Sequence, residues 1–366
     1  MWLIALIGSA SSFVESTLAQ IYKTKDKDSF RGGPAYYMEK GLGKRWLGII
    51  FSILITISFG FVFNAVQANT VSVAFNNAFG LSREAIGIIL VIVTALVIFG
   101  GIHRVAKVSE IIVPILAVLY ILIAIIVLIL NITEIPSVFK LIFESAFGIK
   151  QLTAGGLGAA VMQGIKRGLF SNESGLGSAP LVAAAAKTKN PVRQALISST
   201  GTFWDTVVVC LITGVTLVTT IMKNPDINMS SIQNGGQMTT AAFSQIPVLG
   251  SIILVFGIIT FAYTTVLGWS YYGERCAEYL FGKRATIFFK IIFVFVILLG
   301  PVIELDIVWS LSDIFNALMA IPNIIFSFYG MNVAGLPFPQ WWFPTGLAIV
   351  ACIIATIIFI KKDMFH

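Results

Sequence analysis

The sequence predicts an all-α polytopic membrane protein, and three observations carry that prediction. Of the 366 residues, 57% are hydrophobic and only 11% are charged, whereas soluble domains carry about 45–50% apolar and about 25% charged residues. The mean hydropathy is +0.92. Apolar runs of helix length recur along the chain, and basic residues gather between alternate runs. Together these observations exclude a water-soluble fold.

Each apolar run is long enough to cross a bilayer, whose core of about 30 Å needs about 20 helical residues. The runs exceed the length of a membrane β-strand, so they favour helices over a closed barrel. We therefore expect a single domain, residues 1–366, of about ten helices. Their approximate ranges are 2–22, 47–75, 85–101, 110–131, 152–168, 195–222, 248–273, 286–303, 307–329 and 341–360.

The first run, 2–22, is interpreted as a membrane span rather than a signal peptide, because no basic segment precedes its apolar stretch. Glu15 lies near the inner end of this run, where we expect it to pair with a basic residue of the following loop. The next span, 47–75, carries Asn64 and Gln67 on one helix face above Phe59 and Phe63. Amides above aromatic rings suit a small zwitterion, but an interhelical hydrogen bond explains the amides nearly as well.

Basic residues fix the expected orientation of the chain. Most of the 24 lysines and arginines fall in 23–45, 102–109, 166–193 and 274–284, and the positive-inside rule places these segments in the cytoplasm. The net charge of +7 is then an orientation signal, and we expect a lipid bilayer but no nucleic acid as a partner. Lys361 and Lys362 conflict with the rule if 341–360 spans the membrane, so an interfacial position for that segment stays open.

The segment 152–188 is the richest in polar and small residues. Seven glycines between Gly155 and Gly177, together with Asn172, Glu173 and Pro180, favour a helix broken within the membrane. The alternative is that Gly164 and Gly168 only allow close helix packing. Glu173 follows Lys166 and Arg167, so a gating ion pair and a purely structural pair are both open.

The later spans carry three more candidate residues. Asp205 lies about ten residues into the run 195–222, and a carboxylate at that depth is a candidate for ion binding or gating. Hydrogen bonds to Thr202 or Thr206 are the alternative. Thr264 and Thr265 offer two neighbouring hydroxyl oxygens, the ligand type that alkali cations prefer, although threonine often bonds its own helix instead.

Enzymatic chemistry has little support in this sequence. The three cysteines are too far apart for a metal pair, and the two histidines have no ligand-spaced partner. Asp205 has no Ser–His or second Asp partner, so we expect no catalytic residues and no enzyme. We also expect no cofactor, apart from sodium as a coupling ion if the threonine pair binds it.

One long motif makes the sequence specific. The block KRGLFSNESGLGSAPLVAAAAKTKNPVRQALISSTGTFWDTVVVC resembles the signature region of the sodium:alanine symporter family, the alanine or glycine:cation symporters. FRGGPAYYMEKGLG, FNAVQANT, GGIHRVAKVSEIIVP, YTTVLGWSYYGERC and NALMAIPNII are similar to the same family and follow in the same order. The resemblance extends from about residue 10 to about residue 325.

The resemblance implies a single transport domain in the cell membrane that moves alanine or glycine into the cell with sodium. It also implies a five-plus-five inverted-repeat fold with broken first and sixth core helices. The Gly-rich segment corresponds to the sixth, with its break at Met162, Gln163 and Gly164. Gln67 matches the substrate-facing glutamine of the family, beside Phe63, and Thr264 and Thr265 match its sodium-binding hydroxyls. Asp205, Asn64 and Glu173 are candidates for an ion or gating role.

The chain departs from the family pattern at its start. No Gly-rich T-G-x-G-N type motif occurs, and Met1-Trp2 resembles an internal position of the second core helix. We therefore expect an N-terminally shortened chain that lacks the first core helix. The alternative to a symporter is a truncated, non-transporting membrane protein or a partner subunit.

Overall fold

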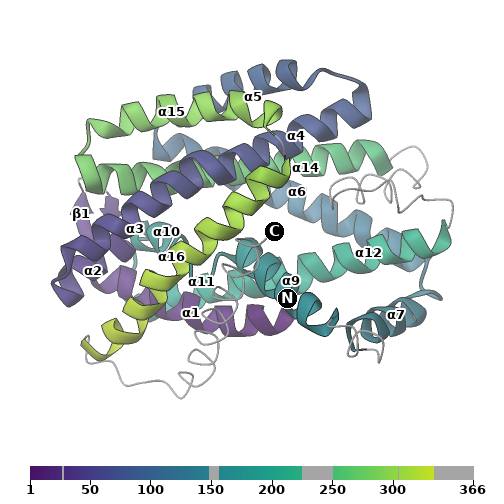
Figure 1. Cartoon of the computed structure of the whole chain (residues 1–366), viewed down its shortest axis with the longest axis horizontal. Helices are drawn as coiled ribbons and strands as arrows, with labels where there is room; N and C mark the ends of the chain where they lie inside the picture. Colours follow the sequence, from purple (N-terminus) through teal and green to yellow (C-terminus); the bar gives the residue numbers. More distant parts are fainter. Residues whose placement is uncertain (27–28, 148–155, 225–249, 304, 334–366) are drawn as a thin grey trace.

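Long helices make up nearly all of the computed structural model, which describes residues 1–26, 29–147, 156–224, 250–303 and 305–333 (Figure 1). Six helices in these ranges are long and apolar enough to cross a membrane, which agrees with an all-α polytopic membrane protein. They are Trp2–Ile21, Arg45–Asn77, Arg104–Leu130, Pro191–Lys223, Ala285–Val302 and Ile307–Ile324. The expected run 341–360 lies outside the described residues, as do Lys361 and Lys362.

The N-terminal region contains a small sheet that the sequence did not predict. Helix α1 (Trp2–Ile21) is followed by strands β1 (Thr24–Asp26) and β2 (Ser29–Arg31), which pair antiparallel with Lys25 opposite Phe30. Helix α2 (Pro34–Leu42) then begins with a proline in its first turn, where the missing N–H has no intrahelical partner anyway. Within the segment 23–45, the described residues thus form a pair of strands and a short helix.

The second span is one helix with a π-helical turn in its middle. It comprises α3 (Arg45–Ile57), η1 (Ser58–Val62) and α4 (Phe63–Phe79). Helix α5 (Arg83–Ile98) follows and is capped by the Ser82 hydroxyl, which accepts the Ala85 N–H at 3.3 Å. Helix α6 (Ile102–Leu130) begins well before the expected run 110–131, so Arg104 and Lys107 lie in a helix rather than a loop. The charged residues extend the helix beyond its apolar part.

The Gly-rich region and its neighbours form α7 (Ile135–Phe147), α9 (Gly156–Asn172) and α10 (Ala179–Ala185). The next span again contains a π-helical stretch, with α11 (Pro191–Thr202), η2 (Phe203–Val209) and α12 (Cys210–Lys223) in one continuous helix. A π-helical turn inside an α-helix often marks a functional position, and Asp205 lies in η2.

The last elements are α14 (Gly250–Phe281), α15 (Ala285–Leu299), the short 3₁₀ turn η4 (Gly300–Val302) and α16 (Leu305–Val333). Phe289 of α15 fits between glycines of two other helices: a Cβ on Gly60 or Gly273 would lie 2.9 or 2.2 Å from its ring. These glycines therefore allow η1, α14 and α15 to approach closely.

Helix α16 crosses the bundle diagonally in Figure 1 and contacts both of its sides, α3 and α4 on one and α1 and α9 on the other. The main core lies around this crossing, where large side chains such as Phe51, Phe59, Phe63 and Phe326 are fully buried. By contrast, α5, α6 and α15 expose many leucines and isoleucines outward. Apolar exposure on that scale suits a lipid environment.

Candidate functional site

The helix interruption is present but lies between two and three turns later than the sequence predicted. Met162, Gln163 and Gly164 are inside the regular helix α9, which ends at Asn172. The chain then runs through Glu173–Ser178 to α10, with left-handed backbone at Glu173 (φ 53°), Gly175 (φ 87°) and Gly177 (φ 79°). We call residues 173–178 the junction loop.

The expected break at Met162–Gly164 is therefore wrong, and helix packing gives the reason. A Cβ on Gly164 would lie 3.2 Å from the Met1 nitrogen, and one on Gly168 would lie 3.1 Å from Ile4 Cγ2. These glycines let α1 approach α9, as the packing alternative proposed. Gln163 is exposed on the structure, and Met162 is half-buried.

An aromatic cluster fills the space between α4, α9, α14 and α16. Phe63 is its centre, with ring centroids 4.8 Å from Phe59, 5.3 Å from Phe170 and 5.4 Å from Trp269. Trp309 of α16 extends the cluster at 4.9 Å from Phe170. Each such pair contributes about 0.5–1.5 kcal/mol beyond the burial of its apolar surface. The cluster therefore stabilises the packing of four helices from distant parts of the chain.

Glu173 of the junction loop borders this cluster. Its Oε1 accepts the Trp269 indole N–H at 2.6 Å, and its Oε2 accepts the Ser178 hydroxyl at 2.6 Å. A glutamate in left-handed backbone is uncommon and strained, so these two bonds help to hold an unfavourable conformation. Glu173 thereby connects the junction loop to α14.

Lys166 and Arg167 do not provide the partner expected for Glu173. Lys166 Nζ lies 3.4 Å from Asp313 Oδ2, and Arg167 Nη2 lies 3.1 Å from the same oxygen. The Arg167 guanidinium also stacks over the Trp309 ring at 4.4 Å. Sequence reasoning missed Asp313, although an acidic residue inside the apolar run 307–329 was a usable signal.

Asn64 and Gln67 have different surroundings in this conformation, so they do not line one site. Asn64 is fully buried, and its Nδ2 donates to the Phe293 carbonyl of α15 at 2.9 Å. That is the interhelical bond of the structural alternative. Its Oδ1 has no hydrogen-bond partner in the described part of the structure.

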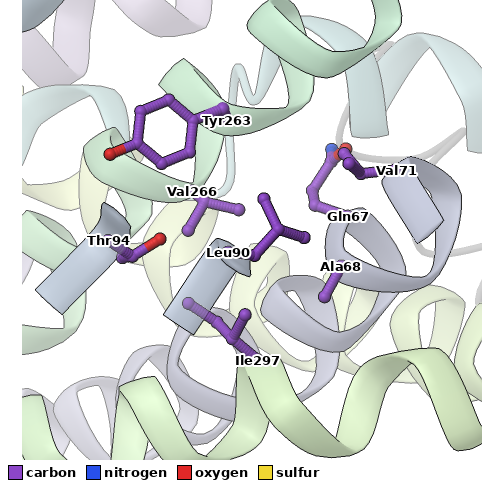
Figure 2. Close-up of a pocket in the computed structure, with 8 residues that line it drawn as sticks. All are labelled: Gln67, Ala68, Val71, Leu90, Thr94, Tyr263, Val266 and Ile297. Carbon is purple, nitrogen blue, oxygen red and sulfur yellow. The ribbon is translucent and has the colours of Figure 1, made fainter. Parts of the chain in front are cut away.

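Gln67 borders a small pocket between α4, α5 and α14, with Thr94, Val266 and Tyr263 among the other lining residues (Figure 2). The pocket has room for about one water molecule and its accessible walls are apolar. It is therefore too small for an amino acid in this conformation. Phe63, one turn earlier on α4, instead faces the aromatic cluster.

Thr264 and Thr265 both donate to the Phe261 carbonyl of their own helix, at 3.1 and 2.8 Å. For Thr265 this contact uses the hydroxyl hydrogen and leaves the oxygen lone pairs as potential ligands. Trp269 follows Thr265 by four residues, so both lie on one face of α14. The threonine pair is thus about one helical turn from the aromatic cluster.

Asp205 lies at a contact between η2 and α9. Its Oδ2 accepts hydrogen bonds from the Ser171 hydroxyl and from Thr206 Oγ1, the latter at 3.1 Å. The contact to Thr206 is the structural alternative named from the sequence, whereas the contact to Ser171 links Asp205 to the helix that precedes the junction loop. These contacts are compatible with an ion or gating role for Asp205 and with a structural role.

Glu15 makes no ion pair with any described basic residue of the loop, so the expected pairing is wrong for the described residues of 23–45. It is fully buried and accepts the Ser11 hydroxyl at 2.9 Å. The basic loop residues pair elsewhere: Arg31 with Glu278 at 2.8 Å, for example. Strand β2 packs against α10, and Arg31 connects it to α14.

The hairpin and the ends of α14 and α15 share an ionic network that the sequence did not predict. Arg275 contacts Glu278 at 2.7 Å, and Lys290 contacts Glu274 at 3.2 Å. Asp26 accepts from Lys283 at 2.7 Å, and this hydrogen bond lowers the pKa of the Asp26 carboxyl. The network fixes the hairpin against the basic end of the helical bundle.

Comparison with known proteins places the chain among membrane transporters of one family. The model of the sodium:alanine symporter family matches residues 1–334. The chain is 49% identical over 328 residues to the probable sodium/glutamine symporter GlnT of Bacillus subtilis, covering 89% of this chain and 67% of the relative. It is 44% identical over 331 residues to the sodium/alanine symporter AgcS of Methanococcus maripaludis, covering 89% and 72%. The amino-acid carrier protein AlsT of Bacillus subtilis is 43% identical over 337 residues, covering 91% and 71%.

Proposed function

Because the chain belongs to the sodium:alanine symporter family, we propose that it is a sodium-coupled symporter carrying a small neutral amino acid into the cell across the plasma membrane. Alanine and glycine are the substrates that the sequence favours. One relative is named for glutamine and another for alanine, so a range of neutral side chains belongs to the proposal. The substrate class is an amino acid with an uncharged side chain, taken up as its zwitterion.

The observation that supports this function most strongly is the meeting of an interrupted helix with an aromatic cluster. The α9–α10 junction lies next to Trp269 through Glu173, and Phe63 and Phe170 complete the apolar surroundings. Interrupted helices in membranes expose backbone groups that can bind the charged ends of a substrate. Aromatic rings then limit the size of its side chain.

In this proposal the substrate contacts Gln67 and Phe63, while Thr264 and Thr265 bind sodium. Met162, Gln163 and Gly164 lie in regular helix, so the backbone contact with the substrate that was expected there is not part of the proposal. The space that Gln67 borders among the described residues is water-sized, so an amino acid needs a wider conformation to reach it. Substrate entry then requires that α4 and α9 separate at the aromatic cluster. Asp205, Asn64 and Glu173 join helices that would move, which supports a gating role for them.

Coupling requires that sodium and the amino acid favour the same conformation. A ligand shifts a conformational equilibrium only by its difference in affinity between the two states. Thr265 and Trp269 share a face of α14, so sodium bound at the threonines would stabilise the position of the helix that forms part of the substrate site. Each ligand would then raise the affinity for the other.

The test is uptake of labelled amino acids into proteoliposomes that contain the purified chain. We expect an inward sodium gradient to drive uptake of alanine, and unlabelled glycine to compete while unlabelled glutamate and lysine do not. Glutamine is the discriminating competitor: inhibition extends the substrate range to larger amides, and its absence restricts the range to small side chains. Uptake that is equal with sodium and potassium gradients contradicts the proposal.

A further inference from the structure

Helix α16 carries polar side chains along its buried face, and two of them have oxygen atoms without partners. Ser312 is 0% exposed and Asn316 is 6% exposed. Ser312 Oγ and Asn316 Oδ1 are both buried and make no hydrogen bond within the described residues. A buried polar atom without a partner is unfavourable, so its presence in a native protein calls for an explanation such as a bound group.

Asn323, two turns further along the same face, shows how a structural polar residue is accommodated in this helix. It is also fully buried, but its Oδ1 accepts the Tyr37 hydroxyl and its Nδ2 donates to the Gly175 carbonyl at 3.0 Å. Both ends of this amide are therefore used within the protein. The oxygens of Ser312 and Asn316 lack such partners in the described part of the chain, so a structural role of this kind does not explain them.

The two oxygens lie in the core that surrounds the aromatic cluster. Val308 and Ala320 belong to the same buried core cluster as Phe63. Val308 precedes Ser312 by four residues and Ala320 follows Asn316 by four, so all of them share one helix face. The oxygens thus interrupt an otherwise apolar surface in the region where the proposed function puts the side chain of the substrate.

The pair offers one hydroxyl and one amide oxygen, and neither group is charged. The hydroxyl can donate a hydrogen bond, whereas the amide oxygen can only accept one. Residues four apart on a helix have Cβ atoms about 5–6 Å apart, a separation that a planar amide can bridge. A side-chain amide therefore complements the pair: its N–H donates to Asn316 Oδ1, and its carbonyl oxygen accepts from Ser312 Oγ.

Charged side chains fit the pair less well. An ionised carboxylate has only acceptors, so it would leave Asn316 Oδ1 facing a negative charge. An ammonium group keeps its full charge, which two neutral dipoles balance poorly in a buried site. The charge nearest to the pair in sequence, on Asp313, is already paired with Lys166 and Arg167. A methyl group, as in alanine, gains neither hydrogen bond.

We propose that Ser312 and Asn316 bind the side-chain amide of a neutral amino acid and thereby determine substrate specificity. This inference rests on the proposed function and names the side-chain class of its substrate. It extends the range of the transporter from alanine to glutamine.

The test compares Ser312→Ala, Asn316→Leu and their combination with the wild type in the full chain. Alanine only lacks the hydroxyl, and leucine has as many side-chain heavy atoms as asparagine. Because the two oxygens have no described partner, removing them should leave the thermal midpoint close to that of the wild type. Ser310→Ala is the matched control, since Ser310 is an exposed residue of the same helix.

The main readout is uptake of labelled glutamine and of labelled alanine into proteoliposomes with an inward sodium gradient. The wild type should carry glutamine. The double variant should lower Vmax/KM for glutamine about tenfold, the effect of two lost hydrogen bonds, while Vmax/KM for alanine changes less than about twofold. Ser310→Ala should leave both unchanged.

Two further measurements separate recognition from structure. Glutamine should raise the thermal midpoint of the purified wild type in sodium, because a ligand stabilises the folded state that binds it, and this increase should shrink in the double variant. Asn323→Leu should instead lower the midpoint without ligand and reduce uptake of both amino acids alike, since Asn323 bonds two other elements.

The possible results distinguish this inference from the proposed function. If alanine is carried while glutamine is neither carried nor stabilising, the inference is wrong and the proposed function stands. Equal losses for both amino acids in the double variant, or a lower midpoint without ligand, would assign the pair a structural role and overturn the inference. If neither amino acid is carried or stabilises the protein, both proposals fail.

Discussion

Trp269 donates its indole N–H to the Glu173 carboxylate at 2.6 Å across 96 positions of sequence. The bond joins the middle of α14 to the point where α9 is interrupted. It explains how a glutamate persists in left-handed backbone, and it connects the aromatic cluster to the helix junction. The arrangement of the proposed site depends on this hydrogen bond.

Replacing Trp269 by phenylalanine should separate the hydrogen bond from the ring contacts. Phenylalanine keeps an aromatic ring in the cluster but leaves Glu173 Oε1 without its donor, which costs about 1–3 kcal/mol for a buried acceptor. We expect a lower thermal midpoint and a higher KM for the amino acid. The control is Trp204→Phe, since Trp204 is 59% exposed. An equal effect of both substitutions would contradict the assigned bond.

Replacing Asp313 by asparagine should destabilise the contact between α9 and α16. The change leaves Lys166 and Arg167 without the carboxylate that both contact, and an uncompensated, partly buried charge is unfavourable. Solvent reaches Arg167, so we expect a loss of about 1–3 kcal/mol rather than the full value for a buried pair. Thermal unfolding in detergent measures it.

The companion variant combines Asp313→Asn with Lys166→Met, which removes one positive charge together with the negative one. Stability should recover part of its loss. No recovery would mean that Asp313 acts through something other than these two bases.

Substitutions at the proposed ligands should affect the two solutes differently. Gln67→Ala should raise KM for the amino acid about tenfold and leave the sodium dependence nearly unchanged, whereas Thr264→Ala with Thr265→Ala should do the reverse. Thr70→Ala is the matched control, because Thr70 on α4 also bonds its own helix, at 2.8 Å to the Val66 carbonyl. Equal losses for both solutes would reject the separate assignments.

The hairpin should loosen in acid. The Lys283 hydrogen bond lowers the pKa of Asp26 in the folded protein, so its contribution is present above the unfolded value of about 3.9. It is lost as the pH falls through the lower folded pKa. We expect the stability difference between wild type and Asp26→Asn, less than about 1 kcal/mol for an ion pair this exposed, to vanish below that pH. A constant difference would contradict the pairing.

Several features of the fold follow from the sequence because they depend on local chemistry. Apolar runs of span length and the clustering of basic residues predicted the polytopic helices, and helices such as α3–η1–α4 occupy such a run. The interruption near the Gly-rich segment was predicted as a feature but misplaced. Glycine marks both a broken helix and a close helix contact, and only the partner helix α1 distinguishes them at Gly164 and Gly168.

Contacts between distant segments could not be predicted from the sequence. Asp313 is the partner of Lys166 and Arg167, and Arg31 pairs with Glu278, because tertiary packing brings residues together that no spacing relates. Gln67 and Phe63 share a helix, yet they face different surroundings. Residues four apart lie on nearly the same helix face, so the difference comes from the neighbouring side chains at each level of α4: Phe170 and Trp269 beside Phe63, and Leu90 and Thr94 beside Gln67.

Sodium is proposed to drive amino-acid transport by this chain. The most direct measurement is accumulation of labelled alanine in proteoliposomes with an imposed inward sodium gradient. We expect alanine to accumulate above its external concentration and to leave again when a sodium ionophore dissipates the gradient. Alanine that only equilibrates, or that accumulates equally with potassium in place of sodium, would contradict the account.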